Sequence, residues 1–508
     1  MQAASSIEMS STVKTPRPVS FTSVMRTVMR CEWLLVRTDP GFWLAIALLL
    51  GCVGYAFHNG RIRLDERASG IAEAQRDEEE RLAKLTGQLG QLERGEVKPP
   101  DAPYRDPRNA IYVGRAQAAT VAHLPDAPLA ITAVGLSDLY PHSFKVSAGS
   151  KDSFLFVDEI ANPTHLLNGS FDLAFVLVYL YPLLLLALSY NVLSGEQEQG
   201  TLALTAASSA PLMTVLVAKL TVRAGGVMAA AIVGIGFHLI VTSPSIGTGG
   251  EWAAHAMLLL TVVLYGLFWI ALALAVNSLR RDSAFNAVAL VMTWVLLLLV
   301  APAAMNATAQ VRHPAPARAE MVLAVRNAAI DTERDRDASE ARYRDEHRNT
   351  GPGDAVTARN SGDDRNQRTL AITLAADERA DAVLADHESE VRAQRRLSDR
   401  MAFLVPPVLI NDAIAELAGN GHTRWDDFLA RIDEFHSQWQ GFFVERARRN
   451  ESLSAADYRA FPKFDASESE TTRLSTSSRR VLTSLAWVGL IAAALLAWAT
   501  RRLSCTSQ

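Results

Sequence analysis

Residues 253–279 read AAHAMLLLTVVLYGLFWIALALAVNSL and contain no Asp, Glu, Lys or Arg. This stretch exceeds the roughly 20 apolar residues that a helix needs to cross a bilayer. Five further blocks have similar composition and polar boundaries: residues 41–57, 173–192, 225–242, 285–307 and 481–500. Buried core helices do not account for six such blocks. The sequence therefore predicts a mainly α, polytopic membrane protein with six transmembrane helices.

The rest of the composition excludes several classes of protein. The chain has 508 residues, is 49% hydrophobic and has a formal net charge of −4. This balance provides no basic surface for nucleic acid. Cys31, Cys52 and Cys505 all lie outside the two long polar regions, residues 58–172 and 308–480. A disulfide framework and a zinc site with cysteine ligands are thus excluded there.

The distribution of Lys and Arg predicts the topology. Residues 1–40, the loops after the second and fourth blocks, and residues 501–508 carry basic residues, whereas residues 243–252 carry none. By the positive-inside rule, both termini are expected in the cytoplasm and both long polar regions outside. The first block is interpreted as a retained anchor, because no cleavage pattern follows it closely.

The first long polar region, residues 58–172, is predicted to be a mixed α/β ectodomain. A helix is expected to continue out of the membrane, with a leucine stripe at Leu82, Leu85, Leu89 and Leu92. The stripe could pack on its own domain or form an intermolecular coiled coil. Prolines at residues 99–103 break the helix, and short β-type runs such as residues 130–134 follow.

The second long polar region, residues 308–480, is predicted to be a helical ectodomain. Charged helices are expected at residues 317–347 and 370–401, separated by Gly351-Pro352-Gly353, which gives an antiparallel hairpin. Residues 425–449 form an amphipathic pattern with an aromatic side. That side could be core or a hydrophobic surface for a substrate or partner, and it comprises Phe428, Phe435, Trp439, Phe442 and Phe443.

Motifs for catalysis are lacking in the sequence. No lysine follows a glycine, so the phosphate-binding loop G-x-x-x-x-G-K-[ST] is impossible, and neither H-E-x-x-H nor G-x-S-x-G occurs. We therefore expect no enzyme activity and no catalytic or metal-binding residues in this chain. A site split between the ectodomains, at Asp138, His142 and His165, is the remaining enzyme alternative.

Several polar groups lie within the predicted membrane helices. They could line a pathway or bond to neighbouring helices, and they include Tyr181, Tyr190, Asn191, His238 and Asn277. Carboxylates within the membrane blocks are lacking, which argues against a proton-driven carrier.

The most informative segment follows the second block and reads LSGEQEQGTL over residues 193–202. Glu196 and Glu198 are predicted to be exposed, while Gly200 permits a sharp bend. Leu202 and Leu204 provide an apolar side before Pro211 ends the element. Such an element can insert into a groove on a cytoplasmic partner; the alternative is an ordinary connecting loop.

This segment resembles the E-x-E-x-G-T-L signature of type-2 ABC exporter permeases. The matching positions are Glu196, Glu198, Gly200, Thr201 and Leu202. The resemblance implies that residues 194–224 contain a coupling helix that docks onto a separate ATP-binding subunit. Gly195 departs from the pattern and leaves the start of this helix open. Residues 32–39, with Glu32, Trp33 and Arg37, resemble the amphipathic elbow helix that precedes the first span in this family.

Other segments resemble a branch of these permeases that has two large ectodomains. They are residues 135–141, 171–176, 181–184 and 406–420, together with Phe428. The branch is similar in layout to the permeases that serve nitrous-oxide-reductase maturation. The resemblance covers nearly the whole chain.

The resemblance implies a bacterial inner-membrane (plasma-membrane) permease, with export as the expected direction. Two permease chains, identical or related, would join two ATP-binding subunits, which hold the ATP and Mg. No cofactor is expected in this chain. The alternative function is a membrane-anchored structural or signalling protein whose ectodomains recruit partners without transport.

Overall fold

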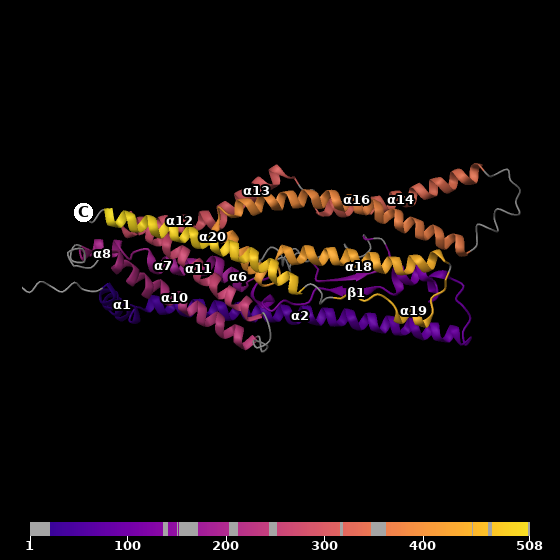
Figure 1. Ribbon diagram of the computed structural model, residues 1–508, viewed down its shortest axis with the longest axis horizontal. Coiled ribbons are helices and arrows are strands. Elements are labelled where there is room, and N and C mark those ends of the chain that lie inside the picture. Colours follow the sequence, from indigo (N-terminus) through magenta and orange to yellow (C-terminus); the bar gives the residue numbers. More distant parts are fainter. Residues whose placement is uncertain are drawn as a thin grey trace, which may run out of the picture.

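The computed structural model describes residues 21–135, 141–149, 151, 171–202, 212–242, 251–314, 318–346, 362–449, 451–465 and 470–505 (Figure 1). These residues are mainly helical and include one two-stranded sheet. The molecule is elongated, with a membrane helix bundle at one end and a long extramembrane region at the other.

Six helical units in the described residues are long and apolar enough to cross a membrane. This confirms the prediction of a mainly helical, polytopic membrane protein. The units are α2 (Pro40–Glu93), α6 (Leu173–Phe175) with η4 (Val176–Leu180) and α7 (Tyr181–Ser189), α10 (Leu212–Thr242), α11 (Glu251–Asn277), α12 (Ser283–Val295) with η5 (Leu296–Val300) and α13 (Ala301–Arg312), and α20 (Glu470–Cys505).

The bundle is built around α11, which packs against α7, α10 and α20. Its large side chains Tyr265 and Trp269 are almost fully buried. α1 (Phe21–Arg37) and the last turn of α20 lie at the same end of the bundle, which we call the α1 end (Figure 1). Residues 1–20 and 506–508 lie outside the described residues, so the placement of both termini in the cytoplasm stays a prediction.

The second and fifth spans each contain a π-helical turn, η4 and η5. Proline explains both, because its ring clashes with the carbonyl four residues earlier and it lacks an N–H to donate. Pro182 faces the carbonyl of Val178 in η4, and Pro302 that of Leu298 in η5. The Tyr265 hydroxyl donates to the Val178 carbonyl at 3.1 Å, so a neighbouring span satisfies a group that the proline leaves without its usual partner.

α2 continues from the membrane into the extramembrane region without a break, as predicted. Asp39 caps its first turn by accepting a hydrogen bond from the Gly41 N–H, and Pro40 occupies the first helical position. Its 54 residues span about 80 Å at 1.5 Å per residue. Leu85 and Leu89 are buried near its far end, so the leucine stripe packs within the chain.

The sheet of the first polar region differs from expectation. β1 (Thr120–His123) pairs antiparallel with β2 (Ser143–Val146). The predicted β-type run at 130–134 is not a strand, because its first three residues form the 3-10 turn η3 (Ala130–Thr132). This turn packs on α2 so closely that a side chain at Gly60 would meet the Ile131 carbonyl oxygen. Packing against a helix therefore overrides the local β preference.

α14 (Arg318–Glu346) and α16 (Gly362–Ala402) pack against each other in the region where a helical hairpin is predicted. Arg379 of α16 ties them together: its guanidinium lies 2.8 Å from the Asp335 carboxylate and 3.0 Å from the Thr332 hydroxyl. Gly351-Pro352-Gly353 lies outside the described residues. α17 (Pro406–Leu417) follows and packs on the extramembrane end of the bundle, against α20 and α11.

The aromatic stripe forms core. It lies on α18 (His422–Arg448), where Phe428, Phe435, Trp439 and Phe443 are buried and Phe442 is partly buried. The same cluster includes Phe144 and Val146 of β2 and Phe461, which follows α19 (Ala455–Arg459). The two polar regions thus share one hydrophobic core rather than forming separate ones.

A buried lysine also joins the two polar regions. Lys151 is bonded to the carboxylates of Asp381 in α16, at 2.6 Å, and of Asp433 in α18. Burial disfavours its charge, but these bonds outweigh burial and raise the pKa of Lys151 above its ordinary value. The Asp377 carboxylate accepts hydrogen bonds from the Lys151 N–H and the Gln440 amide, while burial raises the pKa of Asp377.

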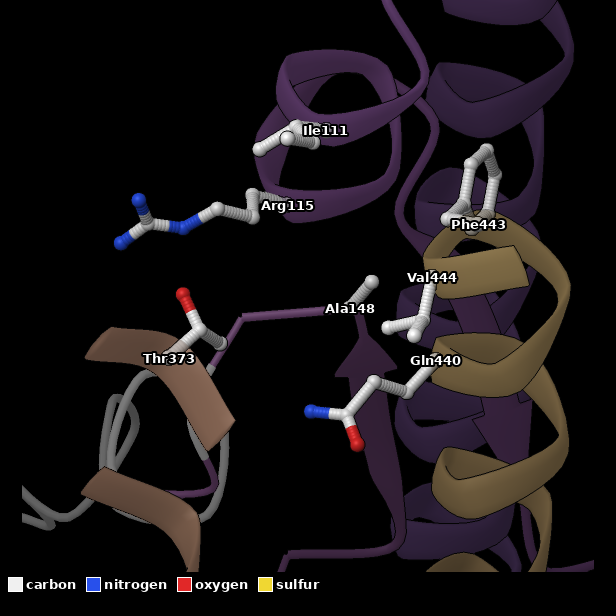
Figure 2. A pocket seen from close by; sticks show the side chains of 7 residues that line it. All are labelled: Ile111, Arg115, Ala148, Thr373, Gln440, Phe443 and Val444. Carbon is white, nitrogen blue, oxygen red and sulfur yellow. The ribbon is translucent and has the colours of Figure 1, made fainter. Parts of the chain in front are cut away.

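A small pocket marks the same junction. Figure 2 shows Arg115 from η2 (Val113–Gln117), Thr373 from α16 and Gln440 from α18 around Ala148. The pocket has room for roughly one water molecule, so it does not serve as a ligand site.

Replacing Trp439 tests the shared core. Trp439→Ala removes a side chain that is 1% exposed and should cost about 3–5 kcal/mol of local stability. Hydrogen exchange of the full chain in detergent measures this as faster exchange of the α18 amides. Gln438→Ala, at an exposed neighbouring position, is the matched control and should change little. Equal α18 exchange in both variants would contradict the shared core.

Candidate functional site

The segment with the E-x-E-x-G-T-L pattern lies at the α1 end of the bundle. Its helix, α8 (Ser194–Glu198), follows α7 after a turn, so it begins one residue before Gly195. Just before α8, Val192 and Leu193 are buried. They cluster with side chains from three spans, namely Leu216, Leu220, Leu274, Ala499 and Leu503.

Local structure explains the glycine and threonine of the pattern. Gly200 has φ +72° and follows the last turn of α8. Its N–H donates to the Gln197 carbonyl at 3.2 Å, and the Thr201 N–H donates to the Glu196 carbonyl at 3.0 Å. This is a Schellman cap, which favours glycine because a side chain is strained at positive φ. Leu202 then packs back onto the cluster around Leu193. Leu204 and Pro211 lie outside the described residues.

A cluster of four charges connects α8 to α1 and α10. The Glu32 carboxylate of α1 accepts a hydrogen bond from Arg223 Nε and lies 3.8 Å from Lys219 Nζ. Lys219 also pairs with Glu196 of α8. Arg223 Nη1 donates to the Asn191 side-chain oxygen at 3.2 Å. Lys219 therefore bridges α1 and α8.

The side chains of this charge cluster are largely buried. The Glu32 side chain is 2% exposed, Lys219 is 14% exposed and Glu196 is 21% exposed. The prediction that Glu196 is exposed is therefore wrong, because its carboxylate faces Lys219. A carboxylate this deeply buried is tolerated when cations and hydrogen bonds compensate for its lost hydration. The cluster thus fixes where α1 lies along α10.

The second acidic residue of the pattern is exposed, as predicted, and has a different partner. Glu198 Oε1 accepts a hydrogen bond from the Ser283 N–H at 2.7 Å, at the start of α12. The hydroxyls of Ser194 and Ser283 are 2.8 Å apart. The side chains of Gln197 and Gln199 are also exposed. α8 is thus held on both sides, by α10 and by α12, with an exposed polar surface between these contacts.

Trp33 and Arg37, the other two residues predicted for the elbow helix, also lie on α1. Trp33 is 45% exposed and Arg37 is exposed, on the opposite side from buried Glu32. The Arg37 carbonyl accepts a hydrogen bond from Trp43 Nε1 at 3.0 Å. This bond joins the end of α1 to the first turns of α2.

The candidate pathway residues are not all brought together. Asn191 belongs to the charge cluster, and Asn277 accepts a hydrogen bond from the Leu193 N–H at 3.3 Å. The Tyr190 carbonyl accepts a hydrogen bond from the Asn286 amide at 3.3 Å. These three residues hold the turn before α8 in place.

Tyr181 and His238 lie elsewhere in the bundle. The Tyr181 hydroxyl donates to the Val262 carbonyl at 3.3 Å. His238 Nδ1 is 2.9 Å from the Gly234 carbonyl, and its ring stacks on Phe57 with centroids 5.0 Å apart. Both side chains make contacts that stabilise the bundle.

The structure adds Lys219, Arg223, Ser283 and Asn286 to the site. Lys219 and Arg223 are four residues apart on α10, and such residues share a helix face. Their spacing was a signal in the sequence. The third span is expected to begin at Gly225, which would leave both residues in a loop, whereas α10 begins at Leu212.

No metal centre accompanies these residues. Within the part of the chain that the structure describes, no group of three or more His, Cys, Asp or Glu side chains could hold a metal ion. Of the alternative enzyme site, Asp138 and His165 lie outside the described residues, so that alternative stays untested.

The fold defines a polytopic membrane protein with a large extramembrane region. Comparison with known families shows that residues 318–467 match a domain family of unknown function, DUF3526. The match covers α14, α16, α17, α18 and α19, and does not include the charge cluster. The chain matches no curated protein.

Removal of one charge tests the cluster. Glu32→Gln leaves the charges of Lys219 and Arg223 partly uncompensated. It should lower the local free energy of unfolding by about 1–3 kcal/mol, the penalty for a buried group deprived of its partner. Faster hydrogen exchange in α1 measures the loss.

The double variant Glu32→Gln/Arg223→Gln completes a thermodynamic cycle. Its cost should be less than the sum of the two single costs, because each single change already breaks the same pair. Arg30→Gln, at an exposed α1 position, is the control. Additive costs would show that Glu32 and Arg223 do not interact.

Proposed function

We propose that this chain is the membrane-spanning permease subunit of an ABC transporter, with export as its direction. In this proposal α8 is the coupling helix and α1 the elbow helix. The observation that supports the proposal most strongly is the position of α8. Its charged groups are tied to α1, α10 and α12, while its exposed surface at Gln197–Gly200 is available to a partner.

The contacts suggest how a push on α8 would reach the membrane. α8 follows α7 after a short turn, pairs with α10 through Lys219, and bonds to the start of α12 through Ser283. A displacement of α8 would therefore act on the second, third and fifth spans together.

The proposal places the chemistry in another subunit. ATP and Mg bind to the ATP-binding partner, and this chain is not an enzyme. Two copies of the permease, or two related chains, assemble with two such partners. The α1 end faces the cytoplasm of a bacterial cell, and the extramembrane region lies outside the inner membrane. The E-x-E-x-G-T-L pattern at residues 196–202 and the six spans support this assignment.

Co-purification tests the proposal. The tagged full chain is purified in detergent with the ATP-binding protein encoded beside its gene, and retention of ATPase activity is measured. Glu198→Arg should release the partner by placing a cation on the docking surface. Glu198→Gln keeps an oxygen to accept the Ser283 N–H, and should weaken binding without disturbing α12.

The matched control is Glu79→Arg, a charge reversal at an exposed position of α2 in the extramembrane region. It should leave the partner bound. If wild type retains no ATPase, or if Glu79→Arg and Glu198→Arg behave alike, the transporter assignment fails. The recruitment of partners by the extramembrane region then becomes the better explanation.

A further inference from the structure

The connection between α16 and α17 differs in composition from the helices around it. Residues 401–407 read MAFLVPP and carry no charge, although α16 is densely charged. Leu404 is 78% exposed and Phe403 is 41% exposed. Ala402 and Val405 are buried, so the exposed part of the run is the adjacent pair Phe403 and Leu404. Two neighbouring large apolar side chains that face outward mark an interaction surface.

The backbone of this connection is suited to apolar surroundings. The N–H groups of Leu404 and Val405 donate to the Met401 and Ala402 carbonyls, each at 2.9 Å. Pro406 and Pro407 have no N–H. Irregular backbone is excluded from lipid where its polar groups lack partners, because each unsatisfied group costs several kcal/mol. Internal bonds and two prolines reduce that cost here.

Two contacts with α20 define the depth of the connection. Arg480 Nη2 lies 2.6 Å from Asp399 Oδ2, and Trp487 Nε1 donates to the Phe403 carbonyl at 2.8 Å. α16 and α20 therefore approach the bundle side by side in the same direction. Arg480 is the last charge before the apolar run that begins at Val481. Trp487 lies about 10 Å beyond Arg480 along the helix.

Phe403 accordingly lies about one helical turn beyond the charged pair, toward the membrane. Its ring packs edge-on against Trp487, with centroids 6.0 Å apart. Tryptophan favours the boundary between lipid and water, where its ring is in lipid and its N–H finds a partner. Exposed Leu490, three residues after Trp487, continues the same apolar surface along α20.

We propose that the side chains of Phe403 and Leu404 insert into the lipid leaflet adjacent to the extramembrane region and anchor the helical hairpin to the bilayer. The partner is the acyl-chain layer of the membrane. Continuity with the lipid-facing side of α20 favours lipid over a protein partner. The anchor fixes the base of α16 and the start of α17, and it does not depend on an ATP-binding subunit.

Spin labels test this placement. The three native cysteines are replaced, and single cysteines are introduced as Leu404→Cys, Leu490→Cys and Leu323→Cys in the full chain, in phosphatidylcholine vesicles. Collisions with oxygen report lipid, and collisions with a water-soluble nickel complex report water. The label at 404 should resemble that at 490 within the span, with several-fold more oxygen than nickel contact. The label at 323, exposed on α14, should show the reverse.

Two results would overturn the proposal. Nickel access at 404 equal to that at 323 would place the connection in water. Low access to both reagents would mean that protein, such as a second copy of the chain, covers it. If Leu404→Cys does not fold, Phe403→Cys provides the same measurement at the neighbouring exposed position.

Discussion

The α1 end of the molecule depends on one buried carboxylate, that of Glu32. A buried charge is costly to separate from its counter-charges, because nothing else then compensates for its lost hydration. Arg223 and Lys219 lie one turn apart on α10 and meet Glu32 from the same face. Because Lys219 also holds Glu196, the positions of α1, α10 and α8 depend on one another.

The membrane part of the fold was predictable, because length and absence of charge are sufficient evidence for a span. The continuation of α2 out of the membrane followed from its leucine periodicity, and α14 and α16 followed from two charged stretches separated by a Gly-Pro-Gly break. The pairing of side chains within the site was not predictable from the sequence. Glu32 and Arg223 are 191 residues apart, and no local pattern pairs them. Glu196 was expected in solvent for the same reason: its partner becomes visible only once α10 begins at Leu212.

The extramembrane region shows the limit of local propensity. Residues 130–134 have β-forming composition, yet they wind into η3 because the small Gly60 on α2 lets the Ile131 carbonyl approach. The aromatic side of α18 was ambiguous between core and interaction surface. The ambiguity is resolved by β2, which comes from the other polar region and buries these rings beside Phe144. Neither outcome could be derived from the segment concerned without its distant neighbour.

The spans divide into stiff and interrupted helices, and this division bears on how the two ends of the molecule are connected. α2 and α20 have no proline after their first residue and run uninterrupted between the α1 end and the extramembrane region. A helix without a proline or π turn transmits displacement with little bending. The second and fifth spans contain both features, at η4 with Pro182 and at η5 with Pro302.

α8 lies where the interrupted spans meet. It continues from the second span and bonds to the start of the fifth through Ser283. The stiff helix α20 contacts the same place, because Ala499 and Leu503 pack on Leu193. At its other end, α20 pairs with α16 through Arg480 and Asp399. The prolines and π turns, at which helices kink, therefore lie in the two spans that contact α8, while α20 links this place to the hairpin. The second and fifth spans, which contain the prolines, are thus distinct from α20, the uninterrupted helix that connects the α1 end to the extramembrane region.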